Sequence, residues 1–512
     1  MTVTGSGIRP GQGSLPVGFR VALDRRTRRL DDGAVLLGGA PPRLLRLSAA
    51  ARQLLADGTC TVTGPTSAAL ARRLLDAGIG HPIAEPASAV PSSAEVTVVV
   101  PVKDRVAGVA RLLAALPSGL GGLLVVDDGS ADAAAVRAVA EGAGATVLRH
   151  SSARGPAAAR NAGLAAATTP LVAFLDSDVV PLTGWLEPLL ARFADPAVGL
   201  AAPRIVALPP AGTLPRIDGL LAAYEAVRSS LDLGPDPALV VPRSRVAYVP
   251  SAALLVRRAA VGAGFDEGMQ VAEDVDLVLR LHAAGWRLRY EPAARVAHDH
   301  RTTLRAWWLR KAYYGTGAAP LALRHPGSVP PMVLSPWSAA VGALLLLGTP
   351  RAVQAAVAVS VVAAERLARR LPVDRPRAAA ARLVAMGVVG TLAQTADAVT
   401  RHYWPVSAAA CLVSRRARRT VIFVAVAEGI VDWWRHRGRD PHAKPGLPGY
   451  VLAHRLDDLA YGAGLWWGAL RHRTVEPLRP IGPAALAAGH PPAGRAGASD
   501  SGRPSGLIRK GE

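Results

Sequence analysis

Two carboxylates separated by one residue, Asp176 and Asp178, end an apolar segment in the sequence FLDSDVVP at residues 174–181. The apolar run predicts a β-strand. Because side chains alternate along a strand, both carboxylates are expected to point to the same side. Carboxylate oxygens suit Mg²⁺ and Mn²⁺, and such a cation would bridge the phosphates of a substrate. A D-x-D pair also arises by chance where a strand ends in a polar turn, so its meaning depends on the other motifs.

A second acidic pair, Asp127 and Asp128, ends another apolar segment in GLLVVDDGS at residues 122–130. A carboxylate in this position can accept hydrogen bonds from the N–H of a base or from ribose hydroxyls. An Asp-Gly turn that only redirects the chain would have the same sequence, so both interpretations stay open.

Two arginines, Arg154 and Arg160, belong to a small-residue helical pattern, ARGPAAARNAGL, at residues 153–164. A guanidinium near the start of this helix can contact the base or the phosphates of a nucleotide. An arginine that faces solvent is the simpler alternative.

Three acidic residues, Glu273, Asp274 and Asp276, begin an amphipathic helical pattern in AEDVDLVLRL at residues 272–281. Acidic side chains are favourable in the first turn of a helix because they face its positive end. A carboxylate there can also act as a general base that takes the proton from an attacking hydroxyl.

The sequence HDHR at residues 298–301 places His298 and His300 on either side of an aspartate. Neither cysteines nor an HExxH pattern lie nearby, so this is not a typical zinc site. One of the two histidines can complete an octahedral cation site that already holds Asp178 and a diphosphate.

The segment that must position these residues is 96–326, where strand-like apolar runs alternate with Ala- and Leu-rich helical patterns. This alternation predicts an α/β domain with a mostly parallel sheet and crossover helices. Ligands of such sheets bind beyond the carboxyl ends of the strands, where the acidic motifs stand. No G-x-G-x-x-G follows any of these strands, which argues against a dinucleotide-dependent dehydrogenase.

Five further segments surround this domain. Residues 1–14 and 479–512 are rich in Gly, Pro, Ala and Ser without periodicity and are predicted to be disordered. Residues 15–83 combine a β-hairpin pattern with short helices, which is a winged-helix-like outline. Periodicity alone favours a simpler interpretation, a helical appendage that packs on the main domain. A Pro/Ser/Ala-rich linker at 84–95 follows, and 327–478 is a hydrophobic helical region.

Charge and hydrophobicity point to a membrane surface. The chain of 512 residues has a formal net charge of +21 and is 50% apolar, with arginine clusters such as RLARR, RRARR and RHRGR in its last third. Such clusters favour contact with anionic headgroups, and no nucleic-acid-binding motif accompanies them, so we expect no nucleic-acid partner. The longest apolar run, 332–348, is at the lower limit of the about 17–25 residues that span a bilayer. Spanning helices and helices that lie at the interface both remain open.

The two cysteines, Cys60 and Cys411, are far apart in the sequence. They exclude a disulfide framework and a cysteine-based zinc site, and they are typical of a reducing, cytoplasmic location. The first residues contain no apolar stretch of the kind found in secretory signals, so none is expected.

The order of motifs VVVPVKD, VVDDGS, GPAAARNAGL, FLDSDVVP, AEDVDLVLRL and HDH resembles glycosyltransferase family 2, whose catalytic domain has the GT-A fold. This resemblance covers residues 96–300. It is closer still to one subgroup, the mycofactocin-system glycosyltransferases, because VPSAALLVRRAA, LRYEPAARVAHDHRT, RHYWP, SRRAR and HRLDDLAYGAGLW agree with that subgroup over most of the chain.

The resemblance implies a nucleotide-sugar donor and a set of residues that bind it. Asp104 and Asp128 would lie against the nucleoside, Arg154 near the base, and Asp176 against the ribose. The family often has a Glu where this chain has Arg105, so the donor contact of that residue is in doubt.

The resemblance also implies a divalent cation, Mg²⁺ or Mn²⁺, held by Asp178 and His298, with His300 as the alternative to His298. Asp274 would be the general base of an inverting displacement. The QxxRW signature of processive synthases does not follow Asp274, which speaks against a membrane polysaccharide synthase.

The subgroup further implies UDP-glucose as donor and, as acceptor, a peptide-derived precursor of a redox cofactor that receives a short β-linked glucose chain. Residues 15–83 then resemble a small peptide-recognition domain. The expected location is the cytoplasm at the inner face of the cell membrane. A family 2 enzyme with a lipid or polysaccharide acceptor is the alternative, and a peptide-binding scaffold with an inactive transferase domain is a third interpretation.

Overall fold

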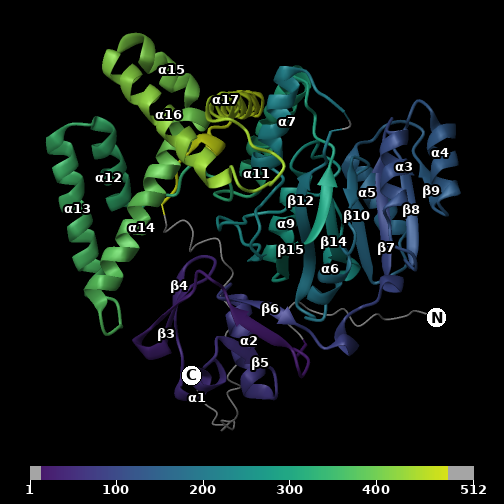
Figure 1. Cartoon of the computed structure of the whole chain (residues 1–512), viewed down its shortest axis with the longest axis horizontal. Coiled ribbons are helices and arrows are strands. Elements are labelled where there is room, and N and C mark those ends of the chain that lie inside the picture. The colour runs from purple at the N-terminus through teal and green to yellow at the C-terminus, as the bar shows by residue number, and fades with distance from the viewer. Residues whose placement is uncertain (1–12, 211, 483–512) are drawn as a thin grey trace, which may run out of the picture.

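The computed structural model describes residues 13–210 and 212–482. The termini predicted to be disordered, 1–14 and 479–512, lie almost wholly outside these residues. Figure 1 shows three parts: a small N-terminal part, a central α/β part, and a C-terminal set of helices.

The central part is built on one long sheet whose strands follow the order β11-β15-β12-β14-β10-β7-β8-β9, with β13 paired to β15. Strands β10, β7, β8 and β9 are mutually parallel, whereas β14 runs antiparallel between β10 and β12. The α/β architecture is therefore as predicted, and the sheet is mixed in its second half. The strands are β7 (Val96–Val102), β8 (Gly122–Asp127), β9 (Thr146–Arg149), β10 (Leu171–Leu175), β11 (Val179–Pro181), β12 (Val198–Ala207), β13 (Ala238–Leu239), β14 (Ala253–Arg257) and β15 (Arg287–His298).

Both faces of this sheet are covered, which explains why β7 and β10 are continuous apolar runs instead of alternating ones. Alternate residues of β7 belong to different cores: Val98 and Val100 pack with α3, α4 and α6, while Val99 packs with α5 and α9. The helices are α3 (Val106–Ala114), α4 (Ala133–Gly142), α5 (Pro156–Ala166), α6 (Glu187–Arg192), α7 (Arg216–Arg228), α8 (Arg258–Val261) and α9 (Glu273–Ala283).

The N-terminal part contains more strands than its sequence predicts. The segment PPRLLRLSAAARQLLADG has one of the helical patterns expected within residues 15–83, yet it contains β4 and becomes helical only at Ala49. Ser48 caps this helix by accepting from the Ala51 N–H. Two three-stranded sheets, β5-β1-β6 and β2-β3-β4, enclose a core with Phe19, Leu36 and Leu74. The elements are β1 (Arg20–Leu23), β2 (Arg28–Leu30), β3 (Val35–Gly38), β4 (Arg43–Arg46), α1 (Ala49–Leu54), β5 (Thr59–Thr61), α2 (Pro65–Asp76) and β6 (Gly80–Ala84).

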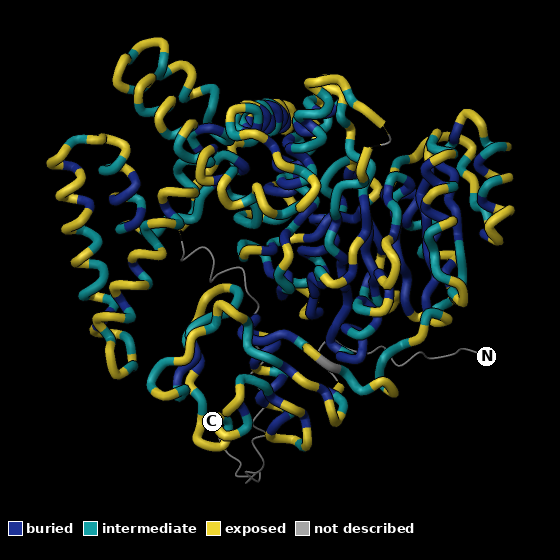
Figure 2. The backbone as a smooth tube through the Cα atoms, in the orientation of Figure 1, coloured by how far each residue is buried: buried dark blue, intermediate teal, exposed yellow. Residues whose placement is uncertain are grey.

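The C-terminal part is helical, as predicted, and its last helix, α17, packs against α10 and against α7 of the central part. Helices α12–α16 extend away from the sheet, and Figure 2 shows exposed residues around most of their surface. The helices are α10 (Leu304–Thr316), α11 (Ala318–Arg324), α12 (Pro336–Leu347), α13 (Pro350–Ala368), α14 (Pro376–Asp397), α15 (Trp404–Val413), α16 (Arg415–His436) and α17 (Leu447–Arg471).

The apolar run at 332–348 forms a helix of only 12 residues, α12. Among the described residues, one helical segment, Pro376–His402, is long and apolar enough to cross a bilayer, with a mean hydropathy of 1.3 and 22% of its apolar window buried. One helix that passes a test of length and composition is weak evidence for a membrane span. It is also a different segment from 332–348, the apolar run that the sequence suggested.

Candidate active site

The short strand β11 brings Asp178 next to the end of β15. The two strands pair antiparallel with Val179 opposite His298, and the Asp299 N–H donates to the Asp178 carbonyl at 2.8 Å. As a result the His298 Nε2 lies 3.6 Å from the Asp178 Oδ1. The motifs FLDSDVVP and HDHR, distant in the sequence, thus form one site.

His298 and His300 lie side by side, with their Nδ1 atoms 3.2 Å apart and their ring centroids 4.6 Å apart. Burial lowers the pKa of each imidazole to about 4, so both rings are neutral near pH 7. A neutral imidazole can offer a nitrogen lone pair to a cation. Of the two, His298 points its Nε2 toward Asp178.

The oxygen that faces His298 is otherwise unsatisfied. Among the described residues, the buried Asp178 Oδ1 and His300 Nε2 have no hydrogen-bond partner. The Arg105 guanidinium lies 3.8 Å from the other oxygen, Oδ2. Because a buried polar atom without a partner is costly, this arrangement fits a cation held by Asp178 and His298. These residues line a cavity of about 30 Å³, room for one or two waters or a small ion.

Asp176, the other carboxylate of the pair, is held by a buried arginine. Arg160 of α5 donates to the Asp176 Oδ1 at 2.6 Å and to the Glu273 Oε1 at 2.9 Å. The same guanidinium lies 5.3 Å from the centre of the Phe265 ring. Arg160 therefore ties the strand-end carboxylate to the first turn of α9.

Asp274 lies in that first turn, two residues after Ala272, whose φ of 63° places it in the left-handed region. Its Oδ2 accepts from the Ser251 N–H at 3.0 Å and its Oδ1 from the Val275 N–H at 2.8 Å. Burial raises the pKa of the Asp274 carboxyl, and the negative charge of Asp176 raises it further, against the opposing effect of Arg160. A carboxylate with a raised pKa is suited to taking a proton from a hydroxyl.

Asp128 uses both oxygens inside the protein. They accept from the Arg154 N–H, the Gly155 N–H and the His150 Nδ1, each at 2.8 Å. Asp128 thereby fixes the loop that leads into α5. The contact of Asp128 with the nucleoside stays a prediction. It would be made by a carboxylate that already accepts three hydrogen bonds.

The other two predicted donor-binding residues are nearer to solvent. Asp104 has a φ of 55°, and its Oδ1 accepts from the Ala131 N–H at 2.7 Å, which joins the loops after β7 and β8. The Arg154 side chain pairs with Glu267 at 2.9 Å, and both are exposed. Arg160, in contrast, is buried and contacts Asp176.

Sequence reasoning missed two buried charges beside the histidines, Glu225 of α7 and Lys311 of α10. Both line the same cavity as Asp178, and their charged atoms are 2.7 Å apart. The sequence does contain a sign of these buried charges, because each lies within an apolar helical pattern, Glu225 in LLAAYEAV and Lys311 in AWWLRKAYY. Such residues are buried only when paired.

Comparison with known proteins identifies the family of this chain. The family described as Glycosyl transferase family 2 matches residues 97–224, and Glycosyl transferase family group 2 matches 171–387. The chain is 49% identical over 474 residues to the "Pre-mycofactocin glycosyltransferase" of two strains of Mycobacterium tuberculosis, CDC 1551 / Oshkosh and ATCC 25618 / H37Rv. The match covers 91% of this chain and 98% of each relative.

The chain belongs to glycosyltransferase family 2. Within that family it belongs with the mycofactocin-system glycosyltransferases, as the sequence motifs predicted, and its central part has the GT-A fold. It is therefore an enzyme, which removes the inactive-scaffold interpretation. A solved mannosyltransferase from Pyrobaculum calidifontis, in complex with GDP-Man and Mn²⁺, matches 67% of this chain and 87% of its own at 21% identity, with a TM-score of 0.33.

Replacing Arg160 by Met should lower the free energy of unfolding by about 3–5 kcal/mol, because two carboxylates would lose their buried cation. The Arg154→Met variant is the matched control, since it removes only an exposed pair and should cost less than about 1 kcal/mol. Denaturant unfolding followed by circular dichroism measures both. Equal losses in the two variants would contradict the central position of Arg160.

Proposed function

We propose that this glycosyltransferase transfers glucose from UDP-glucose to a peptide-derived precursor of mycofactocin, with inversion, and builds a short β-linked glucose chain. The observation that carries the chemistry is the unsatisfied Asp178 Oδ1 facing His298, on the same sheet edge as the buried base Asp274. The acceptor is supported by the 49% identity to the pre-mycofactocin glycosyltransferase over nearly the whole relative.

Asp178 and His298 would hold Mg²⁺ or Mn²⁺, which, when bound, neutralises the charge that develops on the diphosphate leaving group. Asp176 would contact the ribose with its second oxygen, since Arg160 occupies the first. Asp104 and Asp128 would border the nucleoside, and Arg154 the base. The donor would thus lie along the carboxyl ends of β7, β8 and β10.

Asp274 takes the proton from the acceptor hydroxyl in this proposal. The hydroxyl oxygen then attacks the anomeric carbon from the side opposite the diphosphate, the bond between that carbon and the diphosphate oxygen breaks, and the configuration inverts. The raised pKa of Asp274 brings the base closer to the operating pH, and general-base catalysis contributes a factor of about 10²–10⁴.

The N-terminal part, residues 15–83, would recognise the peptide portion of the acceptor. The alternative acceptor is a lipid or polysaccharide, which the exposed apolar helices α12–α16 favour. These helices also support a location in the cytoplasm at the inner face of the cell membrane.

The Asp274→Asn variant should bind UDP as the wild type does and lose about 10²–10⁴-fold in kcat, because only the proton acceptor is removed. For the wild type, kcat/KM should fall with decreasing pH as Asp274 becomes protonated, at a pH above the ordinary aspartate pKa of 3.8. Isothermal titration and a UDP-release assay measure the two effects. Normal turnover by the Asn variant would contradict the assignment.

The Asp178→Ala variant should lose affinity for Mn²⁺ and for UDP together, since the cation held by Asp178 would also bind the diphosphate of UDP. Activity titrated against Mn²⁺ and Mg²⁺ measures this, and His298→Ala should behave in the same way while His300→Ala is affected less. An Asp178→Ala enzyme with unchanged metal dependence would contradict this site.

The acceptor is tested by incubating the enzyme and UDP-glucose separately with the peptide-derived precursor and with a polyprenyl phosphate. Mass spectrometry of the products should show hexose added stepwise to the first only. Transfer only to the lipid would overturn the proposed acceptor in favour of the alternative.

Membrane contact is expected at the α15–α16 turn. Leu412 and Val413 are 87% and 88% exposed, and the RRARR cluster begins at Arg415, after Ser414. Replacing both by Ser should abolish flotation with vesicles that contain phosphatidylglycerol, whereas Val17→Ser, at a site 71% exposed in the N-terminal part, should not. Unchanged flotation of the double variant would exclude this turn as the contact.

A further inference from the structure

Three buried charges connect the histidine pair to the C-terminal helix α17. Glu225 of α7 lies with its Oε2 3.7 Å from the His300 Nδ1 and its Oε1 2.7 Å from the Lys311 Nζ. Lys311 in turn lies 3.1 Å from the Asp457 Oδ2 of α17. The three residues are between 4% and 5% exposed.

Both carboxylates in this chain of contacts have a further hydrogen-bond donor. The Trp307 Nε1 donates to the Glu225 Oε1 at 2.8 Å, and the Tyr224 hydroxyl donates to the Asp457 Oδ2 at 3.2 Å. Burial opposes the charge on Asp457, yet Lys311 and Arg401 hold the pKa of its carboxyl at about 2. An ammonium between two carboxylates in the interior is costly to disturb, because removing one partner leaves an uncompensated buried charge.

The position of Asp457 is fixed by the close crossing of α10 and α17. A Cβ at Gly464 would overlap the carbonyl oxygen of Ala312, and one at Gly315 would overlap the carbonyl oxygen of Tyr461. The two helices are therefore in backbone contact a short distance from Lys311 and Asp457. Little sliding between them is possible without a clash.

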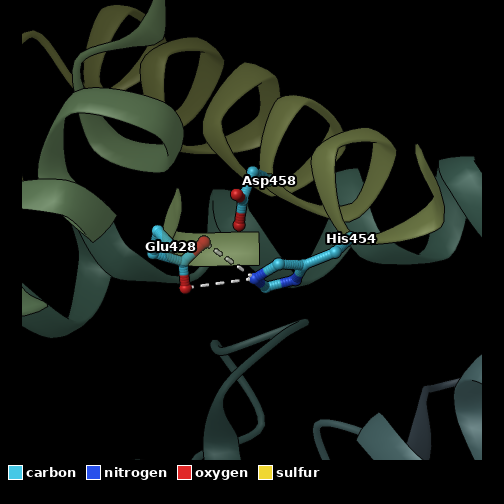
Figure 3. A group of neighbouring side chains, drawn as sticks. All are labelled: Glu428, His454 and Asp458. Atoms are coloured by element: carbon cyan, nitrogen blue, oxygen red, sulfur yellow. Dashed lines mark hydrogen bonds and ion pairs between the residues drawn. The ribbon is translucent and has the colours of Figure 1, made fainter. Parts of the chain in front are cut away.

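A neighbouring cluster between α16 and α17 does not offer a cation site. Figure 3 shows Glu428, His454 and Asp458 turned toward one another from α16 and α17. Arg455 pairs with both carboxylates, and Arg401 lies 3.2 Å from the Asp458 Oδ1. The acidic charge is thus already compensated by protein cations. This cluster extends the same buried ion-pair network and anchors α17.

We infer that Glu225, Lys311 and Asp457 are positioning residues for the cation site, so that the C-terminal part completes the active site in addition to contacting a membrane. Glu225 lies against His300 at 3.7 Å and limits where this ring can move, the His300 ring packs on His298, and Lys311 and Asp457 hold Glu225 in place. This inference rests on the proposed function, because it assumes that His298 ligates the cation.

The test is the affinity of the full-length enzyme for Mn²⁺ in the presence of UDP, measured by electron paramagnetic resonance of free Mn²⁺. The Asp457→Asn variant should bind Mn²⁺ about 10- to 100-fold more weakly, the usual range for residues that support a metal ligand. The loss should appear in the KM for Mn²⁺, with kcat at saturating Mn²⁺ retained.

The matched control is Asp432→Asn. Asp432 is 8% exposed and pairs with Arg228 and Tyr450 in the same network, without a contact to Lys311. It should lower the melting temperature as Asp457→Asn does and leave Mn²⁺ affinity unchanged. Trp307→Phe is a second variant, which removes one donor to Glu225 and should weaken Mn²⁺ binding in the same direction, in case Asp457→Asn does not fold.

Wild-type Mn²⁺ affinity in both Trp307→Phe and a folded Asp457→Asn would overturn the inference, and so would equal losses in Asp457→Asn and Asp432→Asn. A wild-type enzyme that transfers sugar without binding any divalent cation would instead refute the metal assignment of the proposed function. The two failures are therefore distinguishable.

Discussion

The candidate site depends on the short antiparallel pairing between β11 and the end of β15. β11 has three residues, yet its register places Val179 opposite His298 and so brings Asp178 to the histidine pair. A shift by one residue would turn Asp178 to the other face of the sheet, because side chains alternate along a strand. The apolar sheet beneath, buried on both faces, fixes this register.

Charge compensation explains how so many acidic groups can share one edge of the sheet. Arg160 pairs with Asp176 and Glu273 on one side of the site, and Lys311 pairs with Glu225 and Asp457 on the other. Asp178 is different, because its Oδ1 has no hydrogen-bond partner among the described residues, although arginines lie around the same cavity. The position where a buried carboxylate oxygen lacks a hydrogen-bond donor is the position where a divalent cation is proposed.

Local sequence patterns were sufficient to predict the strand-end carboxylates, the first turn of α9 and the α/β class, because each follows from apolar periodicity and the polar residues that interrupt it. Local patterns could not predict that β14 runs antiparallel or that β4 is a strand, since both depend on which strand each of them pairs with. Glu225 and Asp457 were missed for a related reason. Tyr224 and Asp457, which hydrogen-bond through their side chains, are 233 residues apart, and one sequence alone does not reveal such contacts. The donor-binding roles of Asp104, Asp128 and Arg154 come only from resemblance and remain predictions.

The central claim is that one cation is held by Asp178 and His298. A crystal structure of the enzyme with UDP and Mn²⁺, with data collected at the manganese absorption edge, tests it most directly. We predict one anomalous peak at bonding distance from the Asp178 Oδ1 and the His298 Nε2, in contact with the diphosphate. A peak bound by His300 and not His298, or one at Glu428, His454 and Asp458 with none at Asp178, would contradict the account.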